Sequence, residues 1–154
     1  TVDSSGNITP SNQMYPKVPA FKATLSANQS VTDSVFTKIE YDTEEFDTNS
    51  NYDATTNYRY TPTVAGYYSF NIHMYVNSPD RILVGLYKNG STLHWVSDVN
   101  NTSNGFTRTG GSALVYANGS TDYFEAYGYL QKASGTLVFQ SNSGTYFSAH
   151  LVSV

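Results

Sequence analysis

The sequence predicts a single all-β domain, a sandwich of two antiparallel sheets, and three observations carry this prediction. Apolar residues recur with a period of two, turn signals separate these segments at near-regular spacing, and no segment has a helical period. Many short strands without helices are typical of a sandwich or a barrel. The length of 154 residues is ordinary for one domain with one core.

The clearest alternation runs over residues 67–76, where two faces separate cleanly. The face expected to be buried carries Tyr68, Phe70, Ile72, Met74 and Val76. Further strands are expected at residues 21–25, 35–41, 81–87, 92–97, 111–116, 123–130, 136–139 and 145–152. Asn- and Gly-containing turns separate several of them, at residues 88–90, 104–105, 118–119, 133–135 and 142–144.

Residues 1–19 differ from the rest of the chain. They contain Pro10, Pro16 and Pro19 among small polar residues and have few apolar side chains. Such a segment cannot fill a core, so we expect an extended lead-in or linker. Residues 20–154 then form the globular head.

Composition excludes several classes of function. Only 13% of the residues are charged and the net charge is −4, so there is no basic surface for nucleic acid. No apolar run is long enough to insert in a bilayer. The chain has no cysteine, so disulfides and thiolate metal sites are excluded. Fourteen tyrosines suit half-buried sheets and contact surfaces instead.

Spaced aromatic residues in the first half of the chain form a signature, made of Tyr41, Asp47, Tyr52, Tyr60, Gly66, Tyr68 and Phe70. This pattern resembles that of the C1q and tumour-necrosis-factor family of globular heads. Seven residues rather than six separate Tyr52 from Tyr60, and Ile72 stands where the family has an aromatic. Residues 84–90, 111–129 and 145–151 are similar to later strands of the same family, although Ala149 replaces its usual Gly.

The resemblance implies a C1q/TNF-like jelly-roll that assembles as a homotrimer. Cysteine-free heads rich in Asn, Ser, Thr and Tyr look similar to those of phage appendages, so we expect a virion surface appendage or another extracellular location. The leading functional hypothesis is a non-catalytic binding head, at the tip of a phage tail fibre or of an adhesin, for a cell-surface glycan or protein receptor. The alternatives are a structural capping module without a ligand and, more distantly, a carbohydrate-active enzyme.

Tyrosine placement supports the trimer hypothesis. In the strand over residues 123–130 one face is apolar, and the opposite face carries three rings around Glu125. Faces with so many rings usually meet a partner. The candidate interface residues are Tyr67, Tyr75, Tyr123, Tyr127 and Tyr129. In a monomer, the last three become candidates for a ligand surface.

A second candidate site surrounds the only tryptophan. Its rings and polar groups could stack a sugar and bond its hydroxyls, and the residues are His94, Trp95, Asp98, Phe106 and Arg108. The competing interpretation is that the tryptophan packs inside the sandwich or between protomers.

Other chemistry has weaker support. His73, His94 and His150 have no neighbouring ligand at metal-site spacing, and no serine lies in a nucleophile elbow. The acidic run at residues 42–47 is expected to be a solvated loop between strands. It could alternatively supply calcium ligands or a pair of catalytic carboxylates. Apart from this calcium alternative, no cofactor is expected.

Overall fold

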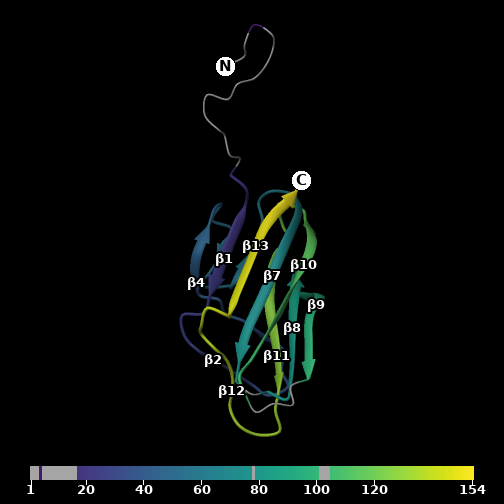
Figure 1. Cartoon of the computed structure of the whole chain (residues 1–154). Coiled ribbons are helices and arrows are strands. Elements are labelled where there is room, and N and C mark those ends of the chain that lie inside the picture. The colour runs from purple at the N-terminus through teal and green to yellow at the C-terminus, as the bar shows by residue number, and fades with distance from the viewer. Residues whose placement is uncertain (1–3, 5–16, 78, 101–104) are drawn as a thin grey trace.

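The computed structural model describes residue 4 and residues 17–77, 79–100 and 105–154, and within these ranges it contains strands and no helix. The strands form two antiparallel sheets that make a sandwich (Figure 1). The predicted all-β, two-sheet fold is therefore confirmed. No helix of the described ranges has the length and apolarity to cross a bilayer.

The first sheet has seven strands and includes both the first and the last strand of the head. Its order is β2-β12-β7-β13-β1-β4, with β10 also paired to β7. The strands are β1 (Ala20–Thr24), β2 (Gln29–Val31), β4 (Thr43–Asp47), β7 (Gly66–Val76), β10 (Thr107–Ala117), β12 (Leu137–Phe139) and β13 (Tyr146–Ser153).

The second sheet has six strands, in the order β5-β6-β11-β8-β9, with β3 also paired to β11. The strands are β3 (Thr37–Lys38), β5 (Tyr52–Asp53), β6 (Arg59–Tyr60), β8 (Arg81–Lys88), β9 (Ser91–Asn100) and β11 (Phe124–Gln131). The chain crosses repeatedly between the two sheets, so β9 and β10 follow one another in sequence but belong to different sheets.

The core lies between the sheets and is rich in aromatic side chains. The five residues of β7 predicted to be buried are at most 1% exposed, as their alternation requires. Phe147 of β13 sits at the centre of an aromatic cluster. Its ring centroid lies 5.0 Å from that of Phe21 and 6.0 Å from those of Tyr41 and Phe70.

The first and last strands meet at one end of the head. β1 and β13 pair antiparallel, and the Leu151 N–H donates to the Pro19 carbonyl at 2.9 Å. The start of β1 and the C-terminus therefore lie together (Figure 1). The predicted lead-in at residues 1–19 lies outside the described residues apart from residues 4 and 17–19.

Two predictions about the segment 35–47 are wrong. Only Thr37–Lys38 is a strand where residues 35–41 were predicted to form one, because the chain turns at Ser34 (φ 58°) and its ladder with β11 covers two residues. The acidic run is a strand, β4, where a loop was expected. Among the described strands it pairs with β1 alone, and at this edge position its first four side chains are all exposed to water.

Candidate functional site

The residues predicted to form one ligand surface lie on two sides of the sandwich. Trp95 and Asp98 belong to β9 of the six-stranded sheet, opposite β8. Phe106 and Arg108 lie beside the seven-stranded sheet, where both contact Tyr75. The Phe106 ring stacks on the tyrosine at 5.2 Å, and the arginine Cζ lies 5.0 Å from the tyrosine centroid. The structure therefore separates this set into two pairs.

His94 belongs to neither pair. It follows Leu93 in β9 and lines a shallow groove between β9 and β10 together with Trp95, Ser112 and Leu114. This groove lies at the edge of the sandwich, where the last strands of the two sheets come together.

Five rings cover the outer face of the six-stranded sheet, and we call them the aromatic band: Phe36, Tyr87, Trp95, Tyr127 and Tyr129. Phe36 contacts both Trp95 and Tyr129, with centroid distances of 4.9 and 4.8 Å. Tyr87 stacks on Tyr127 at 3.9 Å and meets Trp95 edge-on at 6.3 Å. Trp95 is 47% exposed and Phe36 is 42% exposed. The band is thus a connected and accessible aromatic surface.

A glycine in β8 makes room for the tryptophan. Gly85 is opposite Trp95 in the sheet, and a Cβ at Gly85 would lie 2.8 Å from Cζ3 and 3.1 Å from Cε3 of the indole. The six-membered part of the indole therefore occupies the space of the missing side chain. This arrangement lays the indole across the sheet instead of letting it extend into solvent.

Each end of the aromatic band has an ion pair. At one end, Arg81 donates two hydrogen bonds to Asp98, of 3.1 and 2.9 Å, which raises the pKa of the arginine and lowers that of the aspartate. At the other end, Lys38 contacts Glu125, which is only 4% exposed. Burial, followed by the charge of Glu125, raises the pKa of the Tyr127 hydroxyl.

The outer face of the seven-stranded sheet carries a different apolar surface. Tyr67 of β7 and Tyr116 of β10 meet at 5.5 Å, and they are 50% and 48% exposed. Leu114 is 60% exposed, and Phe46 of β4 is 49% exposed. Tyr67 and Tyr75 lie on this side, whereas Tyr123, Tyr127 and Tyr129 lie on the six-stranded sheet. The candidate interface residues are therefore divided between the two outer faces.

The histidines do not converge. His73 of β7 stacks on Tyr146 at 4.8 Å, and His150 is exposed on β13, opposite Ser69. In the described part of the chain, no three His, Cys, Asp or Glu side chains are placed to hold a metal ion.

Three of the four carboxylates of the acidic run, those of Asp42, Glu45 and Asp47, have separate partners. Asp42 accepts hydrogen bonds from the backbone and the hydroxyl of Ser26, and Glu45 pairs with Lys22 at 2.8 Å. Asp47 is used in a turn. Calcium binding by these residues stays a prediction.

Asp47 explains why the signature contains an acid. Its carboxylate accepts hydrogen bonds from the backbone N–H groups of Asn49, Asn51 and Tyr52, at 3.0, 2.6 and 2.6 Å. These bonds fold the chain sharply at Ser50 (φ 55°) between β4 and β5. The remaining signature residues are buried, and Gly66 touches the end of β13, where a Cβ would lie 2.4 Å from the Ser153 carbonyl oxygen. The signature therefore specifies packing and a turn.

We expect Asp47→Ala to lower the free energy of unfolding by about 2 kcal/mol, because three N–H groups lose a charged acceptor. Urea unfolding at a fixed protein concentration measures the change. Glu45→Ala is the control, since it removes only an exposed ion pair worth less than about 1 kcal/mol. Equal losses in the two variants would contradict this role for Asp47.

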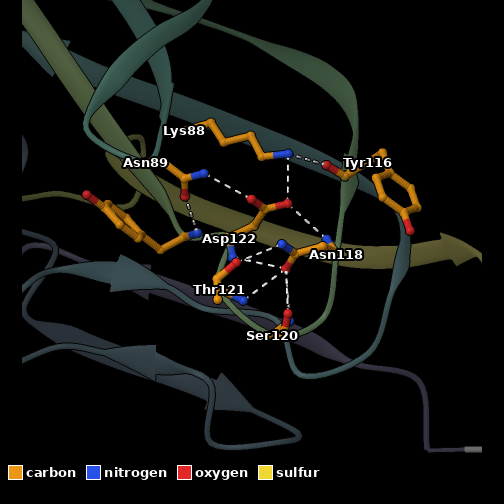
Figure 2. Close-up of polar contacts among 8 residues, drawn as sticks. Lys88, Asn89, Tyr116, Asn118, Ser120, Thr121 and Asp122 are labelled. Atoms are coloured by element: carbon orange, nitrogen blue, oxygen red, sulfur yellow. Dashed lines mark hydrogen bonds and ion pairs between the residues drawn. The ribbon is translucent and has the colours of Figure 1, made fainter.

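A polar network joins the turn after β8 to the loop after β10 (Figure 2). The buried Asp122 carboxylate accepts from Lys88 Nζ at 2.8 Å, Asn89 Nδ2 at 2.9 Å and the Asn118 N–H at 2.9 Å. Asn118 Oδ1 in turn accepts from the backbone N–H groups of Ser120 and Thr121. The predicted Lys-Asn-Gly turn is confirmed, with positive φ at Asn89 and Gly90. This network fixes loop geometry at the end of the head where the termini meet.

The Asp122 carboxylate should make stability depend on pH. Burial alone raises its pKa, but the bonds from Lys88, Asn89 and Asn118 outweigh burial and hold the pKa below its ordinary value. Its stabilising contribution is therefore present above the unfolded pKa of about 4 and is lost as the pH falls below that value. We expect Asp122→Asn to cost about 2 kcal/mol at pH 7.

Thermal unfolding of wild type and Asp122→Asn between pH 7 and pH 3 measures this dependence. The difference between the melting temperatures of wild type and Asp122→Asn should become smaller as the pH drops, since the asparagine does not titrate. A melting-temperature difference that stays constant down to pH 3 would show that the charge of Asp122 does not stabilise the network.

A family model and several solved structures match this chain, and they agree with one another about its fold. A family model described as the C1q domain matches residues 20–152. Among solved structures, murine APRIL is 11% identical with a TM-score of 0.66, covering 88% of this chain and 100% of that one. The Eiger TNF of S. frugiperda is 11% identical with a TM-score of 0.68, covering 89% and 94%. The globular domain of zebrafish complement 1qA protein is 15% identical with a TM-score of 0.64, covering 87% and 97%. No curated protein matches the chain.

Proposed function

The chain belongs to the C1q domain family, and from this premise we propose that it is the non-catalytic binding head of a homotrimer. The finer proposal places the head on a virion appendage such as a phage tail fibre, or on an extracellular adhesin, with a cell-surface glycan or protein as receptor. Its composition supports this placement, since it lacks cysteine and has few charged residues.

The observation that carries the trimer proposal is the apolar outer face of the seven-stranded sheet. Single exposed apolar side chains are ordinary on proteins, but several on one sheet face indicate a contact surface. Here Phe46, Tyr67, Leu114 and Tyr116 are each about half exposed or more. A three-fold ring buries such a face on every protomer by repeating one heterologous contact.

The roles of the acidic side chains support the absence of catalysis. Asp47 and Asp122 bind backbone N–H groups, and Glu125 is paired with Lys38. A catalytic pair of carboxylates needs one acid free to donate a proton and another free to attack or to activate water. These three carboxylates instead serve the fold.

Light scattering coupled to size exclusion tests the assembly. The expected mass is about three times the chain mass of 16.9 kDa, unchanged on dilution through the micromolar range. A well-folded species at the chain mass would overturn the trimer proposal. Binding of the intact head to a glycan array or to host-surface protein tests the receptor role, because a purely structural cap would trimerise equally well and bind neither.

A further inference from the structure

We propose that the aromatic band on the six-stranded sheet is a docking surface for neutral carbohydrate, and this inference rests on the proposed binding-head function. The ligand class is a pyranose glycan without acidic groups, whose ring presents C–H groups on one side. The band stacks against that side, and polar groups at its edge bond the sugar hydroxyls.

The aromatic surface has the chemistry that a sugar ring needs. Trp95 lies across Gly85 with about half of its surface still exposed, and Phe36 extends the surface beside it with a centroid separation of 4.9 Å. Electron-rich ring faces attract C–H groups, and each contact adds buried apolar area. A row of connected rings allows successive sugar units to stack along the sheet.

Charge favours a neutral ligand. The pairs Arg81–Asp98 and Lys38–Glu125 at the two ends of the aromatic band are each neutral overall, and Arg59, which lies over Tyr123 at 4.3 Å, adds one cation. Phosphate-rich polymers and anionic membranes require a cluster of unpaired Lys and Arg, which is more than one such cation. Acidic glycans have the same requirement. Neutral carbohydrate is recognised by stacking and hydrogen bonds without any net charge.

The pair at one end supplies hydrogen-bonding groups in a fixed geometry. Arg81 uses Nε and one terminal nitrogen on Asp98, and the two side chains are 42% and 46% exposed. Their remaining donors and acceptors therefore face solvent beside Trp95, which precedes Asp98 by three residues in β9. Neighbouring sugar hydroxyls can bond a planar donor and a planar acceptor together.

The aromatic band is already ordered before a ligand arrives. Tyr87 and Tyr127 are stacked at 3.9 Å, and Phe36 is held between Trp95 and Tyr129. Rings that are packed in place lose little conformational freedom on binding. A flat and rigid surface suits an extended glycan. A protein partner usually inserts an anchor side chain into a pocket.

The test uses the intact head on an array of neutral and acidic glycans, followed by calorimetric titration of the neutral ones into wild type and variants. The fluorescence of Trp95 is a second readout for the proteins that retain the tryptophan. Neutral pyranose oligomers should bind and change the emission, and Trp95→Leu should weaken binding at least tenfold. Trp95→Phe should retain most of the affinity, because it keeps an aromatic face. Val35→Ala is the matched control, since it removes a 48% exposed apolar side chain next to Phe36 and retains all five rings of the aromatic band.

Gly85→Ala gives a second, independent variant. The added methyl would meet the indole at 2.8 Å and displace it while leaving all five rings in the sequence, so neutral glycans should again bind at least tenfold more weakly. Absence of neutral-glycan binding, or equal binding by wild type and Trp95→Leu, overturns the inference, and so does capture of a protein receptor by the band without any glycan. Light scattering on the same samples measures the trimer separately, so that loss of glycan binding can be distinguished from loss of assembly.

Discussion

The double variant Tyr67→Glu/Tyr116→Glu is expected to run as a folded monomer. Both side chains are exposed on the outer face of the seven-stranded sheet, so the substitutions leave the core of the protomer intact. In the proposed trimer, each places unpaired charge inside every contact between protomers. An uncompensated buried charge costs about 3 kcal/mol or more, which is over a hundredfold in a dissociation constant.

Light scattering and circular dichroism on the same sample check this result. The mass should fall to the chain mass while the strand spectrum is retained. Val35→Glu is the control, because it adds one glutamate at a 48% exposed position beside the other sheet, and it should remain trimeric. A double variant that keeps the trimer mass would place the contact elsewhere.

Phe147→Ala is expected to have the largest effect on stability. The side chain is fully buried and contacts the rings of Phe21, Tyr41, Tyr52 and Phe70 at 5.0–6.3 Å. Removing a buried phenylalanine costs about 3–5 kcal/mol through lost transfer energy and the remaining cavity. That loss is a large part of the stability of a typical domain.

Denaturant unfolding at one protein concentration measures the loss. Phe36→Ala makes the same chemical change at a 42% exposed site with two ring contacts, and it should cost several-fold less. A comparable cost at the two positions would mean that the cluster around Phe147 is not the centre of the core.

The core was predictable from sequence because it depends on local periodicity. Alternation alone identified the buried side chains of β7 and the face of β11 that carries Phe124, Ala126 and Leu130. The turn at Asn89-Gly90 was predictable for the same reason, since its geometry depends on adjacent residues. Strand β4 was missed because an edge strand exposes most of its side chains, and exposed acidic residues indicate a loop.

The surfaces could not be predicted in the same way. The aromatic band joins Phe36, Trp95 and Tyr129, which come from distant parts of the chain and meet only through the pairing of β8, β9 and β11. Conversely, Trp95 and Arg108 are near in sequence but lie on different sheets, because the chain crosses the sandwich between β9 and β10. Nearness in sequence therefore did not predict which of the candidate ligand residues lie together.

The central claim is that one sheet face assembles the head and the other stays open for ligand. Trp95 is the only tryptophan in the chain, so acrylamide quenching of its fluorescence reports directly on the open face. Wild-type trimer and the Tyr67→Glu/Tyr116→Glu monomer should be quenched equally, and neutral glycan should protect Trp95 in both. Strong protection of Trp95 in the ligand-free trimer but not in the monomer would show that the aromatic band is buried between protomers and would contradict the claim.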